Sequence, residues 1–355
     1  MTIYWLLLAF PALMALFAPL REDNEPFGMS MVLGALFLGL AYVLISLMRY
    51  EVGGDWIAYQ AMYDAVQDRP LGEALAVTDI GFSLLLILSA KLGTGIYLVN
   101  AFCSLVLIYG VLRIAMTTRE PWLAVTAAVP YILIVVGLGY VRQGAAIGFI
   151  LLAIAAVGRE RPIKVFALLG LALAFHSTSI AVWPLFAWAL ANRNRLRVLL
   201  LSTVGAAGFL ALVAWRYSNF AAGYIEQEYG SSGTLVRLLM SAVPSVILVL
   251  RYRYFVAPAR SRAMWLWFAF ANLAALASLA VVSSSTAVDR TSLYFACVQI
   301  IVFGQLSALL NLSPRMNLIV RVLVITYSIA VQSVWLIYAT HADSWVPYQS
   351  ILRYF

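Results

Sequence analysis

Long runs of apolar residues follow one another along the chain, separated by short polar segments. In lipid, only a helix or a closed barrel pairs every backbone hydrogen-bonding group, and the alternating pattern of a barrel is absent. The runs therefore predict an all-α polytopic membrane protein with about 12 transmembrane helices, since each crossing needs about 20 apolar residues. They cover residues 3–20, 28–48, 95–116, 121–139, 143–157, 163–176, 178–191, 197–215, 234–250, 263–282, 291–310 and 317–339.

One long polar stretch interrupts this pattern, from Arg49 to Asp79. The apolar run that follows it, Phe82 to Leu92, is too short to cross a bilayer. We therefore expect residues 49–94 to form an outer loop with short helices, one of them interfacial. Because this loop is too small for a core of its own, residues 1–355 are expected to form a single integral membrane domain.

The basic residues indicate the orientation. If the loop after the first helix is cytoplasmic, most lysines and arginines fall on the cytoplasmic side, as the positive-inside rule requires, and both termini face outward. The residues on that side are Arg21, Arg113, Arg119, Arg159, Arg161, Lys164, Arg193, Arg195, Arg197, Arg251, Arg253, Arg260, Arg262, Arg315 and Arg321.

Composition excludes several classes of protein. Hydrophobic residues make up 64% of the chain and charged residues 11%, which no soluble fold accommodates. The net charge of +8 belongs to the cytoplasmic loops, so nucleic acid is not an expected partner. There is no P-loop, dinucleotide fingerprint, HExxH or nucleophile elbow, and neither cysteine has metal-ligand neighbours. We expect no cofactor and no metal.

Two arginines stand at predicted outer helix starts. Arg142 precedes Gln143, and Arg290 follows Asp289. The simpler interpretations are a snorkelling side chain for Arg142 and a solvated ion pair with Asp289 for Arg290. The functional interpretation is an anion site, because a helix start carries positive potential and the guanidinium fork bonds well to phosphate oxygens.

His176 divides the apolar stretch 163–190. Two short helices meeting at 176–179 keep the basic loops on both sides cytoplasmic, so we expect a hairpin with His176 near the outer face. A histidine there either ends a helix through hydrogen bonds or acts on a sugar hydroxyl or phosphate.

Asp55 is either an exposed acidic residue of the outer loop or a second candidate, beside His176, for the base. Aromatic faces suit sugar rings, so Trp56, Tyr59 and the tail residue Tyr348 are candidate substrate contacts, with interfacial anchoring as the alternative.

Six segments, in this order, resemble the motifs of the EpsG family of exopolysaccharide polymerases within the Wzy-like group. Ile80 stands where that family usually has proline. The segments are Gly53-x-Asp55-x-x-x-Tyr59, Asp79-Ile80-Gly81-Phe82, Arg142-Gln143-Gly-Ala-Ala146, His176-Ser-Thr-Ser179, Arg290-x-x-x-Tyr294-Phe295 and Pro347-Tyr348.

The resemblance implies a GT-C-like or Wzy-like glycosyltransferase of the bacterial inner membrane with its active site facing outward. Its substrate would be an undecaprenyl-pyrophosphate-linked oligosaccharide, transferred to a hydroxyl of another lipid-linked unit, and a chain-length regulator or export proteins are further candidate partners. Arg142 and Arg290 would hold the pyrophosphate, while His176 is a third phosphate contact or the base. The remaining site candidates are Asp55, as the competing base, and Gln143, Trp56, Tyr59, Tyr294 and Tyr348, as substrate contacts.

Two other functions remain open. An O-antigen-ligase-like or single-addition polyprenyl-dependent glycosyltransferase would use a similar arginine site and differ only in its acceptor. A transporter of lipid-linked glycans would also line a cavity with arginine. Many transporters have repeated halves and polar sites at the membrane midplane, and the sequence has neither pattern.

Overall fold

The structure is a computed structural model that describes residues 1–21, 27–190, 233–280 and 285–354. Every named element within these residues is a helix, which confirms the all-α prediction. In chain order they are α1 (Thr2–Phe17), α2 (Met29–Met48), α3 (Trp56–Gln67), α4 (Leu71–Leu75), α5 (Ile80–Lys91), α6 (Gly95–Ala115), α7 (Pro121–Ala128), η1 (Val129–Val136), α8 (Gly137–Gly139), α9 (Val141–Val157), α10 (Pro162–Phe175), η2 (Ser177–Val182), α11 (Trp183–Leu190), α14 (Thr234–Arg251), η4 (Tyr252–Tyr254), α15 (Ala259–Ser278), α16 (Ser285–Phe295), α17 (Val298–Phe303), α18 (Leu306–Leu310), α19 (Pro314–Ser333), η5 (Val334–Tyr338), η6 (Ala342–Ser344) and η7 (Ile351–Tyr354).

Several helices are suited to a bilayer. Among the described residues, five are long and apolar enough to cross one: Met29–Met48, Gly95–Ala115, Pro121–Gly139, Thr234–Tyr254 and Pro314–Tyr338. Others, such as α9 and α10, are apolar but shorter. The count of about 12 crossings therefore stays a prediction. The expected helix at 197–215 and the basic residues Arg193, Arg195 and Arg197 lie outside the described residues.

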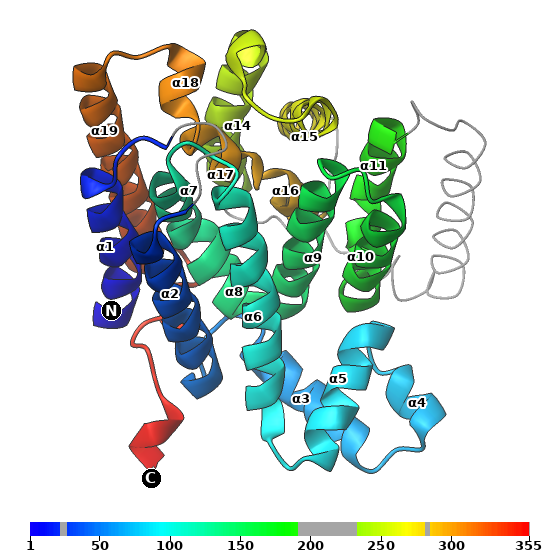
Figure 1. Cartoon of the computed structure of the whole chain (residues 1–355). Coiled ribbons are helices and arrows are strands. Elements are labelled where there is room, and N and C mark those ends of the chain that lie inside the picture. The colour runs from blue at the N-terminus through cyan, green and yellow to red at the C-terminus, as the bar shows by residue number, and fades with distance from the viewer. Residues whose placement is uncertain (22–26, 191–232, 281–284, 355) are drawn as a thin grey trace.

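The connections between helices gather at two ends of the molecule (Figure 1). The basic end carries the connections near Arg119 and Glu160, where Arg260 pairs with Glu160 at 3.7 Å. The opposite end, called here the site end, carries α3, α4 and α5. Both termini lie at the site end, since Tyr4 Oη donates to Trp345 O at 2.7 Å. Which side faces the cytoplasm, and with it the outward placement of both termini, stays a prediction.

The helices α6 and α9 approach each other through glycines. A Cβ atom on Gly148 would lie 2.5 Å from Val106 O, and one on Gly110 would lie 2.7 Å from Gly148 O. Both distances are far too short for carbon against oxygen, so the two backbones meet only because these positions lack side chains. Small residues commonly permit such close packing between helices in membranes.

We expect Gly148→Ala to push α6 and α9 apart and to lower the free energy of unfolding by about 1–3 kcal/mol, the usual cost of overpacking. Thermal unfolding in detergent measures this. Gly170→Ala on α10 is the matched control, because a Cβ atom there meets nothing within 4 Å. Equal unfolding temperatures for the two variants would contradict the close contact.

The segment Pro121–Gly139 is the most buried candidate span, and it is not a regular helix. Its middle forms the π-helix η1, which begins beside Pro130, a residue with no N–H to donate. Backbone carbonyls here accept bonds from distant side chains: Leu133 O from Tyr42 Oη at 2.8 Å and Ile134 O from Trp345 Nε1 at 3.3 Å. These bonds tie α2 and the C-terminal tail to the centre of the molecule.

Two predicted runs had opposite outcomes. The break at His176 is confirmed, because α10 ends at Phe175, η2 begins at Ser177, and His176 between them has extended backbone. The hairpin that would place His176 near the outer face stays a prediction. The single helix expected at 291–310 is wrong, because this run is divided among α16, α17 and α18. The polar residue Gln305 lies in the break between α17 and α18. It exchanges two hydrogen bonds with the backbone of Val256, at 2.8 and 3.1 Å.

Candidate functional site

Arg142 lies in the first turn of α9, directly after the break at Tyr140 that separates α9 from α8. Its Nη1 donates to Thr78 Oγ1 at 2.5 Å and lies 3.4 Å from Asp79 Oδ2. The guanidinium carbon also lies 5.8 Å from the ring centroid of Phe82. The loop before α5 therefore holds this arginine, and its side chain keeps 19% exposure.

Asp55 and Tyr59 stand one turn apart at the start of α3, facing Arg142. Tyr59 Oη donates to Asp55 Oδ2 at 3.1 Å, and the Arg142 guanidinium carbon lies 5.8 Å from the centroid of the Tyr59 ring. Burial, and then the nearby Asp55 carboxylate, raise the pKa of Tyr59, so its phenol stays protonated and remains a donor. Tyr59 is buried and presents no open aromatic face, so its contact with a substrate stays a prediction.

His176 forms a cluster with two hydroxyl groups. Its Nδ1 lies 2.7 Å from Thr178 Oγ1 and 3.2 Å from Tyr294 Oη, and the two hydroxyls are 2.8 Å apart. The imidazole is 5% exposed, and it lies in the connection between α10 and η2. Burial lowers its pKa well below the usual value, and the positive charges of Arg142 and Arg290 lower it further.

The lowered pKa predicts how activity depends on pH. A base must be unprotonated, and this imidazole stays neutral to well below pH 6.5 in the free protein. If His176 is the base of the reaction that this site carries out, kcat/KM should stay flat from pH 8 to 6.5 and fall only at lower pH, since kcat/KM reports the free enzyme. An acid limb with its midpoint at or above pH 6.5 that disappears in His176→Gln would contradict this.

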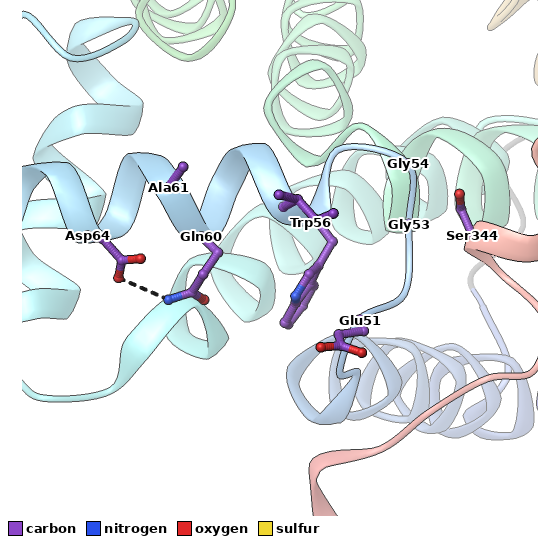
Figure 2. A pocket seen from close by; sticks show the side chains of 9 residues that line it. Glu51, Gly53, Gly54, Trp56, Gln60, Ala61, Asp64 and Ser344 are labelled. Carbon is purple, nitrogen blue, oxygen red and sulfur yellow. Dashed lines mark hydrogen bonds between the residues drawn. The ribbon is translucent and has the colours of Figure 1, made fainter.

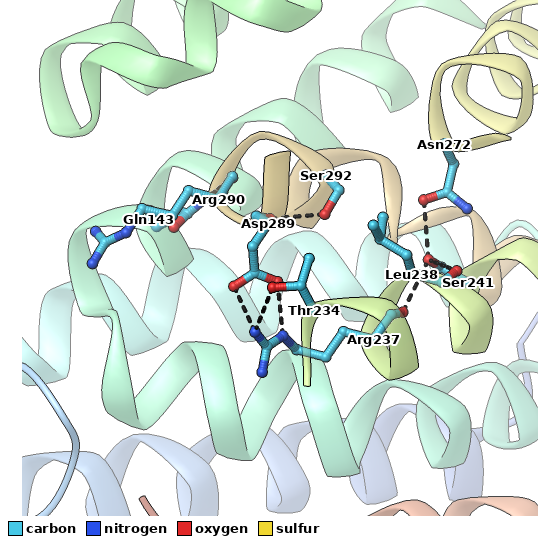
Figure 3. Close-up of polar contacts among 9 residues, drawn as sticks. All are labelled: Gln143, Thr234, Arg237, Leu238, Ser241, Asn272, Asp289, Arg290 and Ser292. Atoms are coloured by element: carbon cyan, nitrogen blue, oxygen red, sulfur yellow. Dashed lines mark hydrogen bonds and ion pairs between the residues drawn. The ribbon is translucent and has the colours of Figure 1, made fainter. Parts of the chain in front are cut away.

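The start of α9 is joined to α16 through Gln143. Its Nε2 donates to Arg290 O at 2.5 Å, which places Arg290 beside the helix start that carries Arg142. Figure 3 shows Arg290 beside Gln143, while the neighbouring Asp289 points the other way. Gln143, predicted to contact substrate, therefore holds the backbone of the second arginine.

Asp289 pairs with Arg237 of α14, a residue that the sequence did not single out. The pair is bidentate, with Nε to Oδ1 at 2.7 Å and Nη2 to Oδ2 at 2.9 Å (Figure 3). Asp289, which the sequence pairs at most with its neighbour Arg290, thus forms a contact between α16 and α14. Arg237 therefore contacts the residue that precedes Arg290.

Arg49 is another residue that the sequence pattern does not single out. It ends α2 and is completely buried. Its guanidinium donates to Val52 O at 2.5 Å, to Asn100 Oδ1 at 2.6 Å and to Leu138 O. These bonds fasten the loop before α3 to α6 and α8. A buried arginine with acceptors on three segments is typical of a structural anchor.

Gly53 explains the first motif in physical terms. Its φ of +105° is a conformation that side chains rarely adopt, and a Cβ atom would lie 2.3 Å from Leu138 O. The loop can therefore pass against α8 only with glycine here. Two residues later, Asp55 N donates to Gly139 O at 3.4 Å. The glycine thus sets the position of Asp55 relative to the start of α9.

The opposite face of α3 lines a cavity of about 610 Å³, called here the loop pocket. Figure 2 shows Glu51 and Ser344 on one side of Trp56 and the hydrogen-bonded Gln60 and Asp64 on the other. Gln60 Nε2 donates to Asp64 Oδ1 at 3.1 Å. Trp56 is only 7% exposed, because its ring packs on the Arg49 guanidinium and on Tyr50.

Tyr348 lies at a different place in the site end. Its hydroxyl donates to Ile45 O at 2.7 Å, and its ring packs edge-on against Tyr4. These contacts fix the C-terminal tail against α1 and α2. Trp345 completes the attachment, since its ring packs on Tyr140 at the break before α9.

Among the described residues, no three histidine, cysteine, aspartate or glutamate side chains gather as metal ligands. Cys103 and Cys297 are both buried free thiols. The charges of the site are therefore those of arginine and aspartate side chains: Arg142 with Asp79, Arg237 with Asp289, and Arg290 near both His176 and Gln143.

The chain is similar to a known protein family over most of its length. Residues 32–350 match the EpsG family. Neither the curated proteins nor the solved structures give a significant match to this chain. The matched range is nearly the whole chain, and it includes Arg49, Asp55, Arg142, His176 and Arg290. The chain therefore belongs to the EpsG family.

Proposed function

We propose that this protein polymerises an exopolysaccharide by transferring an undecaprenyl-pyrophosphate-linked glycan to a hydroxyl of another lipid-linked repeat unit. Membership of the EpsG family implies a role of the exopolysaccharide polymerase type. The observation that carries the chemistry is a buried imidazole with two guanidinium groups within electrostatic reach. The reaction would take place at the site end, on the outer face of the inner membrane.

The arginines act on the leaving group. The bond between the anomeric carbon and the pyrophosphate oxygen breaks, and its electron pair stays on that oxygen. Negative charge grows there in the transition state, and fixed positive groups in a buried site stabilise it strongly. Arg142 and Arg290 have this role, because one is oriented by Thr78 and the other by the bond from Gln143 to its backbone.

His176 receives the proton of the acceptor hydroxyl. Its lowered pKa leaves the imidazole neutral, which suits a base better than a protonated phosphate contact. For Nε2 to take a proton, Nδ1 must carry the hydrogen and donate it to Thr178 Oγ1, which in turn donates to Tyr294 Oη. When pyrophosphate is bound, its charge favours the imidazolium that results. Asp55, already bonded to Tyr59, is then a positioning group for the acceptor or Arg142.

The loop pocket is the proposed binding place for sugar units away from the reacting bond. Carboxylates, an amide and a hydroxyl bond well to sugar hydroxyls, and Glu51, Asp64, Gln60 and Ser344 supply them. The pocket shares α3 with Asp55. A glycan bound along this helix would thus reach from the loop pocket toward the reacting centre.

The direct test uses the purified full-length protein with undecaprenyl-pyrophosphate-linked repeat units in nanodiscs. A ladder of products that differ by one repeat is the expected result. A single added unit would instead identify a single-addition glycosyltransferase, and transfer only to a lipid A type acceptor would identify a ligase. Movement of intact lipid-linked glycan across the bilayer without transfer would contradict the proposal and identify a transporter.

A further inference from the structure

A second cavity, called here the side pocket, lies between α14 and the C-terminal part of α19 with η5. Its volume is about 430 Å³, within the range of about 300–1,000 Å³ that small-molecule sites occupy. Most of the wall is apolar. The apolar lining includes Val236, Met240, Val331, Val334, Trp335 and Tyr338.

The two helices that form this wall are Thr234–Tyr254 and Pro314–Tyr338, and both are candidate membrane spans. Several of the lining side chains are also open to the surroundings, with Val236 at 53%, Val334 at 50% and Tyr338 at 78% exposure. In a bilayer such a surface is open to hydrocarbon, so an apolar chain can enter from the lipid without crossing water.

One end of the side pocket is polar. Arg237, Thr340 and His341 line it together. Asp289 holds the Arg237 guanidinium through two bonds, and the next residue is Arg290 of the candidate site. The polar end therefore contacts α16 at the residue that precedes the arginine assigned to the pyrophosphate. An apolar channel with an arginine and further polar side chains at one end complements a ligand that has a hydrocarbon chain and an anionic head.

We propose that the side pocket binds the first isoprene units of a polyprenyl phosphate lipid, with the phosphate group beside Arg237 and the continuing chain in the bilayer between α14 and α19. This inference rests on the proposed function, because it identifies the occupant as the lipid of the glycan donor. The contact with α16, one residue before Arg290, favours this lipid over bulk phospholipid, because a head group beside Arg237 would lie near the helix that carries Arg290.

The test is photocrosslinking of the full-length protein in phosphatidylcholine nanodiscs with a polyprenyl monophosphate that carries a diazirine near its phosphate end. We expect labelled peptides from α14 and η5, and loss of labelling when unmodified polyprenyl phosphate is added in excess. Met240→Trp and Val334→Trp fill the pocket and should lower labelling at least tenfold. Leu239→Trp and Ile337→Trp, on the same helices but outside the lining, should label within twofold of wild type.

Labelling elsewhere in the chain would overturn the proposal. So would unchanged labelling in both pocket-filling variants, or equal competition by excess phosphatidylglycerol. In the polymer assay, the filled variants should raise KM for an eleven-isoprene donor and for a two-isoprene donor alike, since both carry the first isoprene units. Leu239→Trp and Ile337→Trp should leave both KM values unchanged. Polymer formation that is insensitive to filling would refute the side pocket and leave the proposed function standing. Specific labelling without any polymer would support the side pocket while refuting the polymerase function.

Discussion

Replacing Arg290 with alanine is expected to abolish long polymer while the protein remains in the membrane. The arginine contributes a fixed positive charge to a buried site, and removing one such group from a developing oxyanion costs about 10²–10³ in rate. We expect the same loss for Arg142→Ala. Polymer length on gels and the rate of transfer in nanodiscs measure both effects, with membrane abundance determined in parallel.

Arg142 bonds to Thr78 and lies near Asp79 through its side chain, so its loss also disturbs the loop before α5. Gln143 holds the backbone of residue 290 whatever side chain it carries, so Arg290→Ala keeps this contact between α9 and α16. Lysine variants should keep part of the activity, because they keep the charge and lose the planar fork. Arg69→Ala, on the exposed outer loop, is the control, and full-length polymer from Arg290→Ala would refute the assignment.

The helices could be predicted because the bilayer requires long apolar runs, and the break at His176 followed from the charges on both sides of it. The internal irregularities of the helices could not be predicted. The π-helix in Val129–Val136 is held by side chains from Tyr42 and Trp345, which are far away in sequence. Nothing within residues 121–139 indicates these partners, so the run reads as one regular helix.

In the candidate site, too, some features could be predicted from the sequence and others could not. Arg142, His176 and Arg290 could be chosen because charged or titratable groups next to apolar helices are costly and rare. Their partners depend on helix packing. Asp289 and Arg290 are adjacent in sequence, yet adjacent helical residues point to different sides, so the carboxylate reaches α14 instead. Arg49 looked like a polar residue at a helix end, and only the folded chain shows that it is enclosed.

Arg49→Met is expected to have the largest effect on stability. The substitution leaves the carbonyls of Val52 and Leu138 and the side-chain oxygen of Asn100 without their donor. A buried acceptor without a partner costs about 1–3 kcal/mol, so the loss should be at least about 3 kcal/mol. The loop that carries Gly53 and Asp55 would also be released, so activity should fall together with the unfolding temperature.

Arg353→Met is the matched control for this change, because it removes the same charge from an exposed position near the C-terminus. Thermal unfolding of both variants in one detergent isolates the contribution of burial. Arg49→Lys should be intermediate, since an ammonium group keeps the charge but cannot reach three acceptors in the geometry that a guanidinium spans. If Arg49→Met unfolds at the temperature of Arg353→Met, then Arg49 does not anchor the loop, and the position of Asp55 must depend on Gly53 and the bond to Gly139.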